Sequence, residues 1–267
     1  MAQASTDGAS GTAVDKKTLE IIEKIRRNDP TLGETVGLEM RNLGDHEARL
    51  VSEALRENKS VQGIGLNANN IGAEGAKALS EVFTLDTVLH GIDLQGNKIG
   101  DEGAHALSDA LKQNSTVRNI NLQDNNIGDE GAQALGEALA RNNAVELIWL
   151  GNNKIGDEGA TALSNALKRN NTLQTIYLWE NEIGEEGAKA LSEALKRNNT
   201  LQRINLSNNN IGYQGIRALI DALKVWNRAV IDLRVGRNPG CQDDDDAIKQ
   251  ELDKYHERNK QGCCVIT

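Results

Sequence analysis

Residues 145–172 read VELIWLGNNKIGDEGATALSNALKRNNT, and residues 117–144 before them read VRNINLQDNNIGDEGAQALGEALARNNA. The two 28-residue segments match at most apolar positions, at an asparagine and at an Ile-Gly-Asp-Glu-Gly-Ala run. Six such copies extend from Val61 to about Arg228, with the template LxxIxLxxNxIGDEGAxALSxALKxN. A fixed period of this length indicates a repeat protein in which each unit packs on its neighbours.

Each part of the repeat predicts one structural element. The Ile148-x-Leu150 alternation has the period of a short strand with one buried face. Asn153 follows where the chain turns, and a buried amide there can satisfy loop N–H and C=O groups. The Gly-Asp-Glu-Gly run then begins a helix, with acidic residues at its positive end, while Lys and Arg close helices at the negative end.

Stacking these units predicts a curved molecule. Neighbouring strands lie ~4.8 Å apart, whereas packed helices need roughly 8–10 Å. We therefore predict an α/β fold, a curved horseshoe-shaped solenoid with parallel strands on the concave face and helices on the convex face. The charged helix ends would also form an acidic rim and a basic rim.

Two degenerate repeats flank the six full copies, as capping of an open stack requires. Arg41 stands where the first of them should have asparagine, and Asn238 fits the last after a one-residue insertion. Before the repeats, Leu19, Ile22 and Ile25 predict the buried face of a capping helix. The expected divisions are a disordered tail over 1–15, a helical cap over 16–30, a solenoid of about eight repeats over 31–240, a charged cap helix over 241–260 and a flexible tail over 261–267.

Composition excludes several functions. Lys and Arg total 30 against 39 Asp and Glu, and the net charge of −9 argues against nucleic-acid binding. The His and Cys residues show no metal-ligand spacing, and no nucleophile or phosphate-binding motif is present. We therefore expect a protein that is not an enzyme and has no cofactor or metal. The sequence has neither a secretory signal nor a long apolar run, which predicts a cytoplasmic protein.

Aromatic residues gather at one place on the predicted concave face. Trp149 and Tyr177 differ by 28, so they occupy the same position on adjacent strands, and Trp179 follows two residues later on the same face. Clustered Trp and Tyr side chains are typical of binding hot spots, although they could instead cover one another or an inward-folded tail. We predict a partner protein here. Five surrounding residues would complete the site: Leu147, Glu146, Glu180, Arg118 and Arg203.

The residues Cys264-Val265-Ile266-Thr267 resemble a prenylation signal on Cys264. One lipid binds a membrane only marginally, and Cys263 could supply a second signal through palmitoylation. This interpretation predicts peripheral attachment to the cytosolic face of a membrane. The alternative is a chance ending.

The repeat over residues 30–240 resembles the ribonuclease-inhibitor type of leucine-rich repeat. That resemblance implies a protein-binding scaffold without an active site, which we expect to be a monomer. The repeats and the acidic segment Asp243–Asp246 also resemble Ran GTPase-activating protein, which implies a regulator with a small GTPase as partner. The segment Ile25–Leu32 is similar to the start of the tropomodulin repeat domain, which implies binding to an actin filament end.

Overall fold

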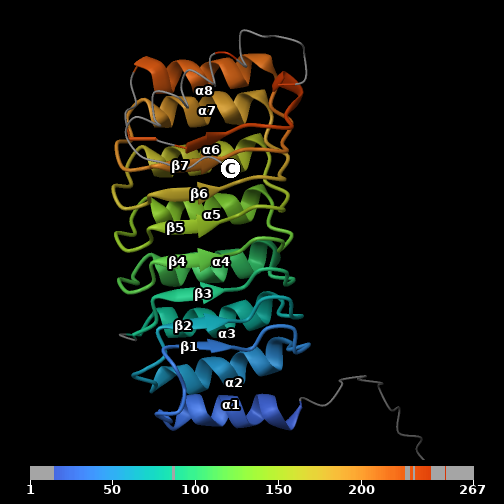
Figure 1. Cartoon of the computed structure of the whole chain (residues 1–267), viewed down its shortest axis with the longest axis vertical. Helices are drawn as coiled ribbons and strands as arrows, with labels where there is room; N and C mark the ends of the chain where they lie inside the picture. The colour runs from blue at the N-terminus through green and yellow to red at the C-terminus, as the bar shows by residue number, and fades with distance from the viewer. Residues whose placement is uncertain (1–14, 86–87, 226–228, 231, 242–249, 251–267) are drawn as a thin grey trace, which may run out of the picture.

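The structure, a computed structural model, describes residues 15–85, 88–225, 229–230, 232–241 and 250. Strands and helices alternate along this part of the chain (Figure 1). The strands are β1 Thr35–Gly37, β2 Gly63–Gly65, β3 Gly91–Asp93, β4 Asn119–Asn121, β5 Leu147–Trp149, β6 Thr175–Tyr177, β7 Arg203–Asn205 and β8 Asp232–Arg234. The helices are α1 Lys16–Arg26, α2 Asp45–Arg56, α3 Ala73–Phe83, α4 Gly100–Leu111, α5 Asp129–Leu139, α6 Asp157–Leu167, α7 Glu185–Leu195, α8 Tyr213–Val225 and the short 3-10 helix η1 Pro239–Cys241.

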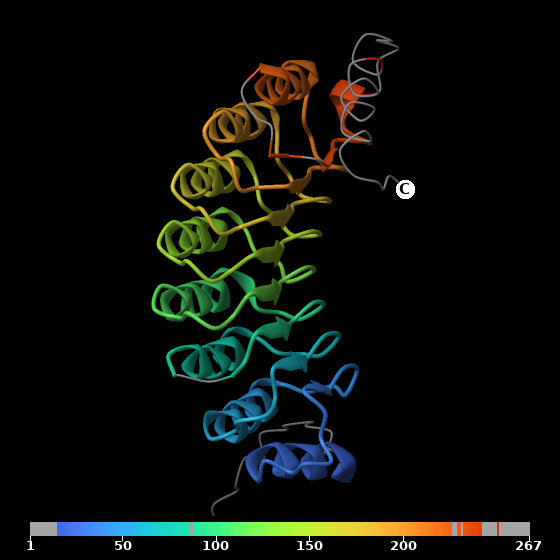
Figure 2. The same cartoon turned by 60° about the vertical axis from the view of Figure 1, so that its left-hand side comes forward.

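These strands form a single parallel sheet in chain order. Each pairs with the next at an offset of 28 residues, as in Ile120 with Ile148, and only the last pair, Ile204 with Leu233, is offset by 29. Figure 2 shows the helices along the outside of an arc and the strands along its inside. The predicted curved α/β solenoid is confirmed.

The core lies between the sheet and the helices. Ile148 and Leu150 of one repeat are fully buried with Leu163 of its helix, and the same three positions are buried along the whole stack. Glycine lets neighbouring helices approach: a Cβ added at Gly159 would lie 2.9 Å from the Cβ of Ala132 in the preceding helix. The regular glycine of the repeat therefore sets the helix spacing.

The repeat asparagine does what the sequence predicted. Nδ2 of Asn153 donates to the carbonyls of Leu122 and Leu150, at 3.0 and 3.1 Å. Its Oδ1 accepts from the backbone N–H groups of Asn125 and Ile127, at 3.0 and 2.9 Å. The side chain is only 8% exposed. The same arrangement, which we call the asparagine ladder, joins neighbouring repeats at Asn69, Asn97, Asn125, Asn153, Asn181, Asn209 and Asn238.

A second set of buried asparagines lies where each helix returns to the sheet. Nδ2 of Asn170 donates to the Leu139 carbonyl of the preceding repeat at 2.7 Å. Its Oδ1 accepts from the N–H groups of Thr172 and Leu173, at 3.0 and 2.7 Å. The other members of this set are Asn58, Asn114, Asn142 and Asn198. Side-chain amides thus tie repeats together at both edges of the sheet.

The first aspartate of the helix also joins neighbouring repeats. Oδ1 of Asp129 accepts from the N–H groups of Gly156 and Gly159 at the start of the next helix, at 2.7 and 2.8 Å. This places an anion at the positive end of that helix. Ala73 replaces the aspartate in one repeat. The helix that this aspartate would have capped is α4, and its start differs from the others. Gly100 has a φ of +59° and is the first residue of α4, whereas Gly156 has a φ of −97° and is the N-cap of α6.

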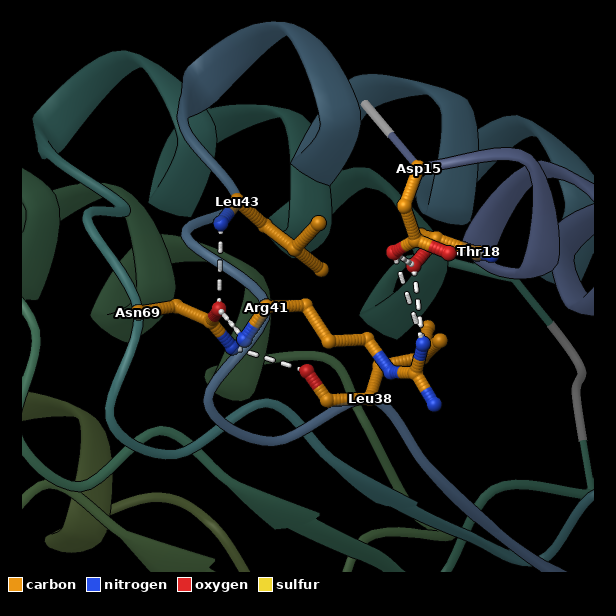
Figure 3. Close-up of polar contacts among 6 residues, drawn as sticks. All are labelled: Asp15, Thr18, Leu38, Arg41, Leu43 and Asn69. Atoms are coloured by element: carbon orange, nitrogen blue, oxygen red, sulfur yellow. Dashed lines mark hydrogen bonds and ion pairs between the residues drawn. The ribbon is translucent and has the colours of Figure 1, made fainter. Parts of the chain in front are cut away.

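The N-terminal end of the stack is closed by α1 (Figure 3). Its N-cap, Asp15, accepts from the backbone N–H of Thr18 at 3.0 Å. Arg41 occupies the ladder position, but its guanidinium Nη1 donates to Thr18 Oγ1 at 3.0 Å and lies 3.6 Å from Asp15 Oδ2. Asn69 of the next repeat completes the contact by accepting from the Arg41 backbone N–H. Arginine here reaches the capping helix, which the shorter asparagine could not.

The buried face of α1 differs from the expected one. Thr18, Ile22 and Ile25 are buried, whereas Leu19 is 44% exposed. Residues 18, 22 and 25 follow the 3.6-residue period, and residue 19 lies about a quarter turn away from their centre. Asp15, expected in the N-terminal tail, is instead the N-cap of α1. The other residues expected in the two tails, most of the C-terminal cap and the two lipidation sites, Cys263 and Cys264, lie outside the described residues.

Candidate partner-binding surface

The concave face is built from rows of side chains that run across the strands. The middle residue of each strand is buried, so the residues on either side of it face away from the helices. The row formed by the third strand residues is Gly37, Gly65, Asp93, Asn121, Trp149, Tyr177, Asn205 and Arg234. It changes from small and acidic at one end to aromatic in the middle and basic at the other.

Trp149 and Tyr177 are in contact at the centre of this row. They are register partners on β5 and β6, and their ring centroids lie 6.1 Å apart at an interplanar angle of 36°. Both rings are half-buried, because each covers part of the other. A tilted pair at this separation is a favourable aromatic arrangement.

Trp179 extends the aromatic surface toward the previous repeat. A Cβ added at Gly151 would lie 2.5 Å from the Trp179 indole Nε1. The indole therefore lies directly on the Gly151 backbone, two residues after Trp149. Gly151 leaves the space that the Trp179 ring fills. We call Trp149, Tyr177 and Trp179 the aromatic patch.

The other predicted site residues divide between the two edges of the sheet. Arg118 and Glu146 lie before their strands, with Arg118 Nε 3.9 Å from Glu146 Oε1, and Arg118 also donates to the Ala144 carbonyl at 3.2 Å. Glu180 lies at the opposite edge, where its Oε1 accepts from Asn208 Nδ2 at 2.9 Å. Arg203 is exposed at the start of β7.

Leu147 begins β5 and is half-buried on the concave face, in register with Asn119 and Thr175. Glu146 also lines a groove of about 600 Å³ at the edge where the strands begin. The rest of that groove consists largely of Asn, Gln and Thr side chains from three repeats. A polar groove thus follows the edge of the sheet where the strands begin, with Glu146 as its charged group.

Glu39 and Asp93 form an acidic pair on the concave face that was not predicted from the sequence. The Glu39 carboxylate lies over two glycines, since a Cβ at Gly37 would be 2.5 Å from its Oε2, and Gly65 leaves similar space. Partial burial raises the pKa of Asp93, and the negative charge of Glu39 raises it further, against hydrogen bonds from Gln95 and Asn121. Glu39 occupies the same repeat position as Trp179, which is the signal that could have identified it.

Among the described residues, no group of His, Cys, Asp and Glu side chains is arranged to hold a metal ion. Burial raises the pKa of the Cys241 thiol, which donates to the Val235 carbonyl, so this cysteine is kept in its unreactive form. No helix in the described ranges is long and apolar enough to span a bilayer.

Comparison with known proteins identifies the repeats. The family model described as Leucine Rich repeat matches residues 58–80, 87–108, 113–136, 150–164, 169–192 and 197–219. No curated protein sequence matches the chain.

Two solved structures are similar in part. The leiomodin-1 structure titled actin-binding site 2 is 26% identical with a TM-score of 0.46, over 53% of this chain and 81% of that one. The tropomodulin C-terminal domain of Caenorhabditis elegans is 16% identical with a TM-score of 0.51, over 60% of this chain and 94% of that one. The similarity to the tropomodulin domain shows a shared fold. Together with the sheet and the asparagine ladder, the matched segments show that this chain is built from leucine-rich repeats.

Proposed function

We propose that the chain is a non-enzymatic scaffold that binds a partner protein through the aromatic patch on its concave face. The observation that carries the proposal is the pairing of Trp149 with Tyr177, with Trp179 over nearby Gly151, on a face where neighbouring repeats have Asn, Ser or Gly. Leucine-rich repeats generally form binding scaffolds, and the fold by itself assigns no partner. The 28-residue unit with a full α-helix further supports assignment to the ribonuclease-inhibitor type.

The geometry of the patch favours tight binding. Trp and Tyr carry much of the energy at protein interfaces when they are held rigidly and desolvated on contact. Here each ring is held before the partner arrives, because Trp149 contacts Tyr177 and Trp179 contacts Gly151. Little side-chain entropy remains to be lost on binding. Arg118, Glu146 and Arg203 would orient the partner around this centre.

The test compares four forms of the full chain as baits in native lysate. They are wild type, the triple variant Trp149→Ala/Tyr177→Ala/Trp179→Ala, Gly151→Ala and the control Val225→Ala, which truncates an exposed apolar residue at the end of α8. Removing each hot-spot aromatic should cost roughly 2 kcal/mol, about 30-fold in affinity. Circular dichroism checks that each variant is folded.

We expect one protein to bind wild type and Val225→Ala equally, and the triple variant not at all. Gly151→Ala keeps all three aromatics but displaces the Trp179 indole, so it should weaken binding without abolishing it. Equal recovery on wild type and the triple variant would show that the aromatic patch is structural.

Three narrower expectations remain predictions. Acceleration of GTP hydrolysis by a small GTPase would favour the Ran GTPase-activating resemblance, and slower elongation at actin pointed ends would favour the tropomodulin resemblance. Prenylation of Cys264, with or without palmitoylation of Cys263, predicts a mass increase in protein from its native cell that Cys264→Ser abolishes.

A further inference from the structure

A second surface with the features of a binding site lies on the convex face. A groove of about 820 Å³ follows α5 and α6 and reaches the end of α7. Gly136, Ala140 and Ala162 line it with small apolar groups. A Cβ added at Gly136 would lie 3.0 Å from the Ala162 carbonyl oxygen, so the two helices meet at the bottom of the groove.

Two departures from the repeat remove side chains from this groove. Gly136 stands where the adjacent repeats have Ser108 and Ser164, and Ala140 stands where they have Lys112 and Lys168. Both changes remove side-chain atoms from the gap between α5 and α6. A smaller groove of about 280 Å³ lies at the equivalent place between α2 and α3, where Ser52 and Arg56 stand at the positions of Gly136 and Ala140. The groove between α5 and α6 is therefore a larger and more apolar form of a gap that recurs in the stack.

Cations gather at the end of the groove where the helices finish. Arg141, Arg169 and Arg197 occupy the same position in three successive repeats, and all three are exposed. They line the groove together with Lys168. By contrast, nearby Lys112 forms ion pairs with Asp109 and with Glu137 of α5, and Lys196 forms one with Glu193. Among the described residues, none of the three arginines forms an ion pair, although Arg197 and Lys168 lie near enough to Glu193 to help lower the pKa of its carboxyl group. Arg141 and Arg169 are the cations most available to a ligand.

The groove carries an excess of positive charge on an acidic protein. Four cations line it against two anions, Glu137 and Glu158, whereas the whole chain has a net charge of −9. Lys168 and Arg169 lie at the end of α6, and Glu158 lies at its start, so the positive charge is concentrated at one end. An arginine guanidinium can bind a carboxylate through two parallel hydrogen bonds.

We propose that this groove binds an acidic segment of a partner protein. Small apolar side chains of that segment would contact Gly136, Ala140 and Ala162, and its carboxylates would bind Arg141, Arg169 and Arg197. The negative charge of the rest of the protein opposes approach to an anionic membrane, whereas a narrow peptide can enter the groove. The site lies on the face opposite the aromatic patch, and so the two can be occupied together.

The test uses the full chain and a short fluorescent peptide of Glu, Ala and Gly, with fluorescence anisotropy as the readout. Its counterpart has Gln in place of every Glu. Wild type should bind the Glu peptide and not the Gln peptide, with affinity that falls as salt is raised. Arg141→Gln/Arg169→Gln/Arg197→Gln should weaken binding about tenfold or more. The control Lys77→Gln/Lys98→Gln/Lys154→Gln removes the same charge elsewhere and should change affinity less than about twofold.

The variant Ala140→Lys distinguishes binding that needs the apolar floor of the groove from binding that depends on positive charge alone. It restores the lysine of neighbouring repeats and adds a cation, but it fills the apolar floor. We expect it to weaken peptide binding, whereas attraction by charge alone would strengthen it. The triple aromatic variant should bind the peptide normally, so failure here is distinguishable from failure of the concave-face proposal.

Several results would overturn the proposal. They are stronger binding by Ala140→Lys, equal losses in the two charge variants, or binding of phosphatidylserine vesicles with no binding of the peptide. Peptide binding that appears only after Asp243–Asp246 are changed to Asn would assign the groove to this chain's own acidic segment instead. Circular dichroism of each variant confirms that losses of binding do not arise from unfolding.

Discussion

Replacing Asn153 with Ala tests whether the asparagine ladder holds the stack together. The side-chain amide donates to the carbonyls of Leu122, Leu150 and Gly151. Its oxygen accepts from the backbone N–H groups of Asn125 and Ile127. Alanine would leave the two buried N–H groups without their acceptor. An unsatisfied buried group costs roughly 1–3 kcal/mol, so the free energy of unfolding should fall by about 4 kcal/mol.

Urea denaturation followed by far-ultraviolet circular dichroism measures this loss. Asn143→Ala is the matched control, because Asn143 is exposed ten residues earlier and should change stability by less than about 0.5 kcal/mol. Since the ladder joins adjacent repeats, the variant should also unfold less cooperatively. A loss below about 1 kcal/mol would refute the reasoning, because it would mean that water or local rearrangement satisfies the freed backbone groups.

Three further predictions concern single positions in the stack. Ala73→Asp restores the carboxylate that other repeats place at the start of the next helix. The N–H groups of Gly100 and Gly103 already donate to the Asn125 and Ile99 carbonyls, so the gain comes from the helix dipole and should be about 0.3–1 kcal/mol in urea denaturation; a destabilised variant would mean that the altered helix start is the better fit. Gly131→Ala places a Cβ 2.8 Å from Ile127 Cγ2 and 3.1 Å from the Ala104 Cβ of α4. It should cost about 1–3 kcal/mol by the same assay, and an unchanged urea midpoint would count against close helix packing. Asp93→Asn should stabilise the protein at neutral pH and have little effect in acid. Because the pKa of Asp93 is raised above 3.8 in the folded state, its contribution to stability is present below that value and is lost as pH rises through the folded pKa. Urea midpoints measured across this range should show the two proteins converging at low pH, and parallel profiles would contradict the assignment.

The sequence predicted those features that repeat. The strand, the buried asparagine, the helix and the curvature each follow from a residue pattern that recurs every 28 positions, and local physical rules apply equally to every copy. The shared face of Trp149, Tyr177 and Trp179 followed from spacing in the same way.

Features that depend on one side chain reaching across repeats were not predictable. Arg41 was recognised as a departure from asparagine, but its partner Thr18 lies outside the repeats, so no periodicity relates them. The contact of Trp179 with Gly151 and the position of Glu39 over Gly37 depend on side-chain direction. The convex groove requires two small residues on one helix to face a neighbouring helix, which becomes apparent only when the stack is assembled.

The second set of buried asparagines has a consequence for covalent modification. Asn58, Asn114, Asn170 and Asn198 each begin an Asn-x-Ser/Thr sequence, the acceptor pattern for N-linked glycans. In the folded protein these side chains are almost inaccessible, and Nδ2 of Asn170, the atom that would carry the sugar, donates to the carbonyls of Leu139 and Asn142. A glycan attached there would take one of those hydrogens and would have no space beside the preceding repeat. Folding and glycosylation at these four positions therefore exclude each other.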